Sequence, residues 1–372
     1  MTLPQQYGTH IQTSTCAVTV ASYSEPVAAW ARQYFGQWWH ATPEDAPYGW
    51  SLVEADVDPA EVAAITQEVL DYQHQETTYA NTPMLHRRTP GRTILAAQPG
   101  DQLAYRYDHG VGVLRIVGTE QTAVALAAAR LAREVIRGKL LLDGWSILHA
   151  SAVTNADGET ILTLGPKGAG KTTVGLLLAR QGWRLLANDR VFVKPDADGV
   201  RVLPWPSAAA IGFGLLDALG LYDPVADRVK AGEELHPTQA QAVTDALLTS
   251  SRTPIRNAKG KELKPQFHPH QLADWLGLTL ATEGRAARLL FPTVIPDAVP
   301  TVLDDTPTLT EADFFTSATE DRYPDVFDLL PVGAGRDADR VTELLAGLPH
   351  HALTLGHDTD ANTALLTKAA AL

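Results

Sequence analysis

The chain has 372 residues, enough for two domains or one enlarged domain. Its net charge of −13 and lack of a basic tract argue against binding to nucleic acid or other polyanions. A single cysteine, Cys16, excludes an internal disulfide framework and argues against a cysteine zinc site. Neither a signal sequence nor an apolar run of membrane-spanning length is recognised, so a cytoplasmic protein without membrane partners is expected.

The first 118 residues have the pattern of a small α+β domain. Short segments in which apolar and polar residues alternate lie close to turn residues, which predicts strands and hairpins. One helix is predicted over 59–72, with Asp58 as its N-cap. The predicted strands cover 16–20, 93–96, 102–107 and 111–117.

Five aromatic residues lie close together in this N-terminal region. We interpret them as part of its hydrophobic core, because large aromatic side chains contribute most when they are buried. A surface that stacks against a substrate is the alternative. The five are Trp30, Tyr34, Phe35, Trp38 and Trp39.

Residues 119–372 alternate between predicted strands and helices, which favours an α/β domain with a central β-sheet flanked by helices. Apolar residues from Glu120 to Leu142 recur near the helical period and predict a long amphipathic helix at its start. Further helices are predicted at 207–219, 237–249, 269–276, 334–347 and 359–370, and strands at 190–194, 200–203 and 289–294, with a hairpin turn at 196–199.

The most specific motif of the chain is a glycine-rich loop over 165–173, which matches the phosphate-binding pattern G-x-x-x-x-G-K-[ST]. An apolar strand over 160–164 precedes it and a helical pattern follows it, which is the context that the motif needs. Backbone N–H groups of such a loop surround phosphate oxygens, and the helix N-terminus adds positive charge. The predicted nucleotide-binding residues are Gly165, Pro166, Lys167, Gly168, Ala169, Gly170, Lys171, Thr172 and Thr173.

Within this loop two side chains have distinct predicted tasks. Lys171 reaches the β- and γ-phosphates of a nucleoside triphosphate such as ATP, and the Thr172 hydroxyl holds Mg²⁺. Two strands flank the motif along the chain: one over 146–153 contains His149, and one over 183–187 ends at Asn188 and Asp189. A carboxylate at a strand end is typical of the Mg²⁺ site of a P-loop enzyme.

The order of these segments, L-H-A-S-A-V, then G-P-K-G-A-G-K-T-T, then L-L-A-N-D-R-V, resembles the HPr kinase/phosphorylase family. It is most similar to the HPr-kinase-related proteins of bacterial specialised metabolism. The resemblance covers about 120–372 and implies a P-loop kinase domain of HPr-kinase type, which uses ATP and Mg²⁺. The N-terminal third resembles no family that we can name.

The resemblance also implies roles for the flanking residues. His149 matches the family's histidine, Asp189 matches the second residue of its aspartate pair, and Asn188 stands where the first aspartate is expected. Because an amide cannot accept a proton, the base role falls on Asp189, assisted by His149. A core histidine that donates to a backbone carbonyl is the alternative for His149.

A basic segment over 252–264 is the last candidate part of the site. The chain has nine lysines; three of them, Lys259, Lys261 and Lys264, lie here. A basic loop follows the core strands in HPr kinases, and cations stabilise the charge on a transferred phosphoryl group. The candidates to contact the phosphates are therefore Arg252, Arg256, Lys259, Lys261 and Lys264, with Lys261 and Lys264 assigned to cofactor binding. A solvated charge run is the alternative.

Four other polar residues are assigned to structural roles. His268 and His270 are interpreted as surface or capping residues, because no ligand cluster accompanies them. Asp304 and Asp305 are interpreted as a turn.

Three functions agree with the sequence. The favoured one is a kinase that phosphorylates a hydroxyl of a small molecule, such as a nucleoside or sugar-like biosynthetic intermediate. A kinase for a protein or peptide serine is the second, and a nucleotide-binding regulator without catalysis is the third. The identity of the acceptor, the choice between ATP and GTP and the formation of a homo-oligomer stay open.

Overall fold

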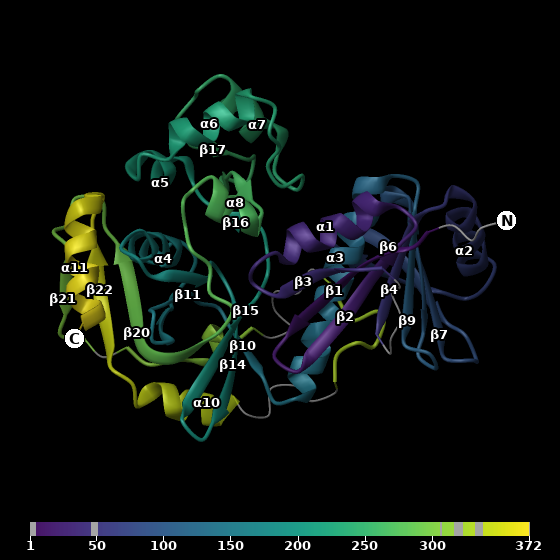
Figure 1. Ribbon diagram of the computed structural model, residues 1–372, viewed down its shortest axis with the longest axis horizontal. Coiled ribbons are helices and arrows are strands. Elements are labelled where there is room, and N and C mark those ends of the chain that lie inside the picture. Colours follow the sequence, from purple (N-terminus) through teal and green to yellow (C-terminus); the bar gives the residue numbers. More distant parts are fainter. Residues whose placement is uncertain (1–4, 46–50, 306, 316–322, 332–337, 372) are drawn as a thin grey trace. The chain divides into compact units, whose positions relative to one another are not determined.

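The computed structural model describes residues 5–45, 51–305, 307–315, 323–331 and 338–371. The chain forms two compact units (Figure 1): one comprises Met1–Trp145 and Phe315–Arg336, and the other Ser146–Phe314 and Asp337–Leu372. The sequence suggested a boundary at 118/119. The units divide after Trp145 instead, because the long helix α3 (Gln121–Leu142) packs on strands of the first unit.

The first unit is built on a nine-stranded sheet in the order β3-β1-β2-β4-β9-β8-β7-β6-β5. Helix α1 (Glu25–Phe35) packs on β1 and β2, α3 packs on β2, β4 and β9, and α2 (Pro59–Leu70) packs on β7, β8 and β9. A short 3-10 turn, Pro99–Asp101, joins β7 to β8. The strands are β1 Tyr7–Thr13, β2 Cys16–Ser22, β3 His40–Glu44, β4 Leu52–Val57, β5 Gln75–Tyr79, β6 Thr82–Arg88, β7 Thr93–Gln98, β8 Leu103–Asp108 and β9 Val113–Gly118.

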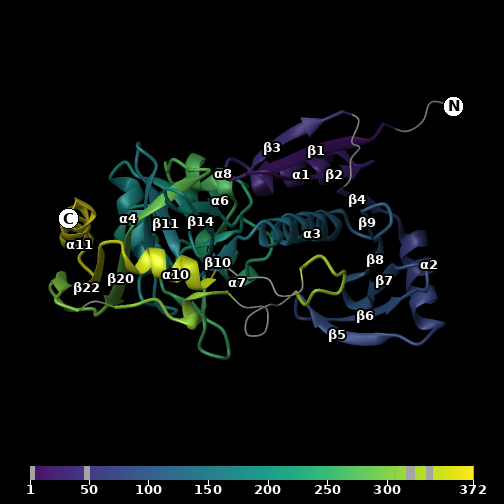
Figure 2. The same cartoon turned by 90° about the horizontal axis from the view of Figure 1, so that it is seen from below.

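The two faces of this sheet have different coverings. Leu95, Ala104 and Val117 form a small core with α2. Because side chains alternate along a strand, the neighbouring Tyr105 and Ile116 point to the opposite face. Figure 2 shows α2 and α3 on opposite sides of β8 and β9.

Most local predictions for this unit are confirmed. The helix predicted over 59–72 is α2, and the Asp58 carboxylate caps it by accepting a hydrogen bond from the Glu61 N–H at 2.9 Å. All four predicted strands are present, as β2, β7, β8 and β9. Of the aromatic cluster, Tyr34, Phe35, Trp38 and Trp39 are buried as core residues, whereas Trp30 is partly exposed.

A close approach inside this unit explains one helical glycine. A Cβ atom on Gly138 of α3 would lie 1.9 Å from the carbonyl oxygen of Leu329, so the segment 323–331 rests directly on the helix backbone. The Asp325 carboxylate orders that segment by accepting from the N–H groups of Leu329 and Leu330, both at 2.8 Å. Only glycine permits this contact without a shift of the backbone.

We therefore expect Gly138→Ala to destabilise the protein by about 1–3 kcal/mol, because overpacking outweighs the roughly 1 kcal/mol that alanine gains over glycine in a helix. Gly214→Ala is the matched control, since its Cβ meets nothing within 4 Å and the helical preference acts alone. Thermal unfolding of both variants checks this. A Gly138→Ala protein as stable as the Gly214→Ala protein would contradict the packing.

The second unit contains a mixed sheet in the order β10-β14-β15-β20-β12-β11-β13, and β22 pairs with β20 and β21. Helix α4 (Lys171–Arg180) packs on β11, β12 and β13, and also on α11 (Thr359–Ala371). Helix α10 (Ala338–Ala346) packs on β14 and β15. The strands are β10 Ser146–Leu148, β11 Ser151–Thr154, β12 Glu159–Thr163, β13 Arg184–Ala187, β14 Val191–Asp196, β15 Gly199–Pro204, β20 Gly284–Val294, β21 Thr301–Leu303 and β22 His350–Leu355.

The predicted hairpin of this unit is present, with β14 and β15 joined through a turn at Gly199. The strand predicted over 289–294 is the second half of β20, and the helices predicted at the C-terminus are α10 and α11. Residues 334–337 of the predicted helix lie outside the described residues. Strands β10, β11, β12, β13, β14, β15 and β20 contribute to one hydrophobic core with α10.

Helices and two short antiparallel strand pairs form a lobe of the second unit (Figure 1). The prediction of a helix over 207–219 is too long, because β16 (Ala209–Ala210) pairs with β19 (Gln266–Phe267) and α5 begins only at Phe213. The sequence analysis missed α6. The helices are α5 Phe213–Ala218, α6 Tyr222–Lys230, α7 Gln241–Leu248 and α8 Pro269–Asp274. No helix among the described residues is long and apolar enough to cross a membrane.

Candidate functional site

The glycine-rich loop joins β12 to α4, as the motif requires. Gly168 and Gly170 adopt φ values of +89° and +109°, which L side chains rarely adopt. A Cβ at Gly170 would in addition lie 2.8 Å from the side chain of Val294 on β20, so two constraints require glycine there. The loop thus turns its backbone tightly onto the end of the sheet before α4 begins.

Lys171 lies across this loop. Its ammonium group donates hydrogen bonds to the carbonyl oxygens of Gly165, at 2.6 Å, and Pro166, at 3.2 Å. The first turn of α4 is tied to the sheet, since the Ser151 hydroxyl on β11 donates to the Lys171 carbonyl at 2.8 Å. A positive charge and a helix N-terminus therefore share one small region, which favours phosphate binding.

Strand register brings the other candidates to the same edge of the sheet. Strand β11 pairs antiparallel with both β12 and β13, so β12 and β13 run in the same direction on either side of it. Ser151 is opposite Thr163, at the end of β12, and Ala152 is opposite Ala187, at the end of β13. The loop after β12, residues 188–189 after β13 and residues 149–150 before β11 therefore all leave the sheet at one edge.

His149 precedes β11 at this edge and is partly buried. Its backbone N–H donates to the carbonyl oxygen of Asp313 at 2.8 Å, and the preceding Leu148 forms an antiparallel bridge with Phe314. The short 3-10 turn Glu311–Asp313 thus fixes the backbone at His149. The sequence analysis missed this turn, although Thr310 and Asp313 carry a capping-box signal.

Asn188 and Asp189 follow β13. The Asp189 side chain is 55% exposed, and one carboxylate oxygen lies 3.7 Å from the Arg190 guanidinium, so the carboxylate is accessible to a ligand. Asn188 is partly buried beside it. They therefore follow the end of a strand, which is where the sequence predicted the carboxylate of a Mg²⁺ site.

The residues present suit Mg²⁺ brought in with a nucleotide. A hydroxyl from Thr172 and a carboxylate from Asp189 are oxygen ligands of the kind that Mg²⁺ prefers, and nucleotide phosphates supply the rest. Within the described ranges no group of three or more His, Cys, Asp or Glu side chains is placed to hold a metal ion by itself. A metal carried by Thr172 and Asp189 would therefore depend on the phosphates.

The basic segment over 252–264 forms an ordered hairpin, in which β17 (Ile255–Arg256) pairs with β18 (Glu262–Leu263). The Asn257 amide oxygen accepts from the N–H groups of Lys259 and Lys261, each at 3.0 Å. Lys264 forms an ion pair with Glu262 at 3.5 Å. The segment is thus more structured than a solvated charge run, while the contact of Lys261 and Lys264 with phosphates stays a prediction.

We expect Lys261→Ala and Lys264→Ala each to lower kcat by about tenfold while raising KM for ATP less, because a contact to the γ-phosphate strengthens in the transition state. Lys230→Ala is the control, since Lys230 pairs with Asp227 and Ser250 on the surface of the same lobe. Steady-state kinetics measure both constants. Wild-type values in both hairpin variants would assign the hairpin a structural role only.

The histidines of the helical lobe differ in part from their predicted roles. His268 caps α8 as expected, but only 3% of it is exposed, so it is a buried residue and not a surface one. Its ring lies against His236 and His270. Burial lowers the pKa of His268 to about 3 and the pKa of His236 to about 4, so both rings stay neutral near pH 7.

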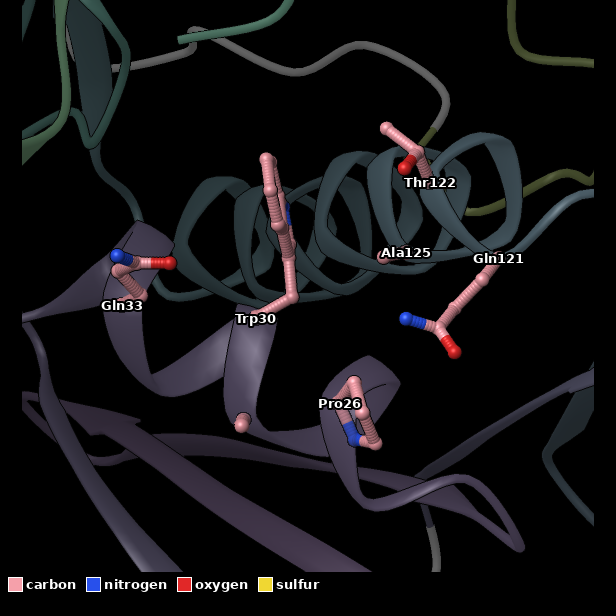
Figure 3. A pocket seen from close by; sticks show the side chains of 7 residues that line it. Pro26, Trp30, Gln33, Gln121, Thr122 and Ala125 are labelled. Atoms are coloured by element: carbon pink, nitrogen blue, oxygen red, sulfur yellow. The ribbon is translucent and has the colours of Figure 1, made fainter. Parts of the chain in front are cut away.

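A separate pocket of about 480 Å³ lies inside the first unit, between α1 and α3 (Figure 3). Its lining contains the partly exposed Trp30 and the amides of Gln33 and Gln121, and no titratable side chain is among the described residues that line it. This pocket can pack an apolar group but offers no acid or base. The glycine-rich loop, His149 and Asp189 belong to the second unit.

Comparisons with known proteins add little to this picture. No family model and no curated protein matches the sequence. Among solved structures, the chain is similar to the Hpr(Ser) kinase/phosphatase from Coxiella burnetii, with 12% identity and a TM-score of 0.20. The match covers 43% of this chain and 65% of that one, so the chain spans just under two thirds of that enzyme.

Proposed function

We propose that the second unit is an ATP-dependent kinase, which binds the triphosphate along the loop over 165–173 and transfers the γ-phosphate to a hydroxyl group. The observation that carries the proposal is the arrangement of one sheet edge. There the Lys171 ammonium lies over a strand–loop–helix turn, and the strand register brings Asp189 and His149 to the same edge. Phosphoryl transfer needs this combination of phosphate binding, metal ligand and base.

The reaction divides among these groups as follows. Loop N–H groups and Lys171 bind the β- and γ-phosphates, and Thr172 with Asp189 would hold Mg²⁺ against them. A bound Mg²⁺ would supply positive charge that neutralises the phosphate oxygens. Asp189, assisted by His149, accepts the proton of the acceptor hydroxyl, and Asn188 can only orient that hydroxyl by hydrogen bonding.

For the acceptor we favour a small molecule over a peptide serine. The accessible Asp189 carboxylate lies at the sheet edge, where a small hydroxyl compound can approach in line with the γ-phosphorus. The deciding experiment offers nucleosides, sugars and serine peptides to the purified protein with Mg²⁺ and ATP or GTP. Transfer to a small hydroxyl compound supports the proposal, transfer to peptides alone replaces its acceptor, and no transfer to any compound contradicts a kinase.

A further inference from the structure

Three arginines line one side of α3 in the first unit: Arg130, Arg133 and Arg137 share a helix face, because they are three or four residues apart. Arg133 donates to the Tyr34 hydroxyl at 2.9 Å and to the Glu134 carboxylate at 3.2 Å. Arg137 donates to the other Glu134 oxygen at 2.9 Å. Both of these guanidinium groups therefore donate to oxygen acceptors inside the unit.

Arg130 is different. Its guanidinium lies over two aromatic rings, 4.8 Å from the centroid of Tyr323 and 5.8 Å from that of Tyr79. Across the described ranges, the structure shows neither a hydrogen bond nor an ion pair for Arg130. The aromatic faces attract the positive charge but offer no lone-pair acceptor to the five N–H groups of the guanidinium. These N–H groups are therefore available to donate hydrogen bonds to a ligand.

The side chain of Tyr79, whose ring lies beneath Arg130, carries a second polar group without a partner among the described residues. Tyr79 is 2% exposed, and its hydroxyl oxygen is buried without a hydrogen-bond partner among the described residues. Burial raises the pKa of Tyr79 well above its usual range, against the opposing effect of Arg130, so the hydroxyl is protonated near pH 7 and can donate. Leaving such a group unpaired costs about 1–3 kcal/mol.

The hydroxyl of the neighbouring Tyr105, in contrast to that of Tyr79, has a hydrogen-bond partner. It donates to the Gln98 side-chain oxygen at 2.6 Å. The nitrogen of the same Gln98 amide donates to the Tyr79 carbonyl and to Thr82, so Gln98 has no group directed at the Tyr79 hydroxyl. The buried Tyr105 hydroxyl thus has a hydrogen-bond partner, and the buried Tyr79 hydroxyl has none among the described residues.

We propose that Arg130 and the Tyr79 hydroxyl form a binding site for a small oxyanion, a carboxylate or a phosphate group. Arg130 can only donate, and the protonated Tyr79 hydroxyl has a proton to donate, so a single group that pairs with both is an acceptor, and a negative charge also compensates Arg130. Figure 2 shows the yellow-green segment 323–331 beside α3; its Tyr323 packs on Tyr79 and its Phe327 on Tyr105. The site is separate from the glycine-rich loop and independent of the kinase proposal.

Thermal unfolding of the full chain tests this site. Potassium phosphate, potassium sulfate and potassium acetate are compared with potassium chloride at equal ionic strength. An anion at about ten times its Kd is expected to raise Tm by about 2–4 °C. A response to phosphate and sulfate alone assigns a phosphate-type ligand, and a response to acetate assigns a carboxylate.

Three variants locate the effect. Tyr79→Phe is expected to raise Tm in chloride, because it removes an unpaired buried hydroxyl, and to lose more than half of the anion-induced shift. Tyr105→Phe, the matched control, is expected to lower Tm in chloride and to keep the shift. Arg130→Met is expected to lose the shift while it keeps the side-chain volume.

Lys171→Ala separates this site from the glycine-rich loop, which also suits phosphate. The anion-induced shift is expected to persist in that variant. The proposal is overturned if no anion raises Tm, if Tyr79→Phe and Arg130→Met keep the full shift, or if the shift disappears in Lys171→Ala.

Discussion

Lys171→Ala is expected to lower kcat for phosphoryl transfer at least about a hundredfold, with the fold retained. In the proposed reaction, the ammonium group neutralises charge that grows on the β- and γ-phosphates as the bond breaks, and loss of one such contact typically costs that much. The side chain is not part of the core: it lies over the loop carbonyls of Gly165 and Pro166. Its removal should therefore leave the melting temperature nearly unchanged.

The measurement is a turnover assay with Mg²⁺–ATP beside thermal unfolding. Lys368→Ala is the control, because it removes an exposed lysine near the end of α11. A Lys171→Ala enzyme with unchanged turnover would show that the loop does not take part in the reaction. A loss of fold, seen as a large fall in melting temperature, would instead assign Lys171 a structural role.

Asp189→Asn is expected to remove nearly all turnover, by about two to four powers of ten, since it removes the proposed base and the proposed metal ligand together. His149→Ala is expected to leave a reduced rate with a shifted pH dependence, because it removes the group that assists Asp189 in accepting the proton. Asp198→Asn is the control: this aspartate is 82% exposed in the hairpin turn between β14 and β15.

pH–rate profiles of wild type and the three variants check these expectations. With Asn188 beside Asp189, we also expect no efficient attack of phosphate on the phosphorylated product, because one carboxylate of the resembled family's pair is missing. That reverse reaction is assayed by adding inorganic phosphate to purified product. Efficient phosphorolysis, or an Asp189→Asn enzyme that keeps most of its kcat, would refute this account of the site.

The parts of the fold that were predictable from the sequence depend on neighbouring residues. The glycine-rich loop was recognisable because its conformation needs glycines at positions of positive φ. Helix α2 was recognisable because the neighbouring Asp58 caps it. The hairpin of β14 and β15 was recognisable through Gly199 at its turn. In each case the information lies within about ten residues.

Other features depend on residues that are distant in the sequence. The sequence predicted helix α3 as the first element of the second domain, but in the structure it packs on β2, β4 and β9 of the first unit. The backbone at His149 is held by Asp313, and Gly138 is required by Leu329. No local pattern records such partners, because hydrophobic faces and backbone groups accept any neighbour of suitable shape.

The sequence by itself determined the glycine-rich loop, the residue types around it and the amide at Asn188, since these are properties of local chemistry. Only the tertiary structure decided the order of the strands, and with it the single sheet edge where Lys171, Asp189 and His149 come from three separate segments. It also decided which buried groups stay unpaired. The Tyr105 hydroxyl donates to the Gln98 side chain, whereas the Tyr79 hydroxyl has no partner among the described residues, and no local sequence pattern distinguishes the two tyrosines.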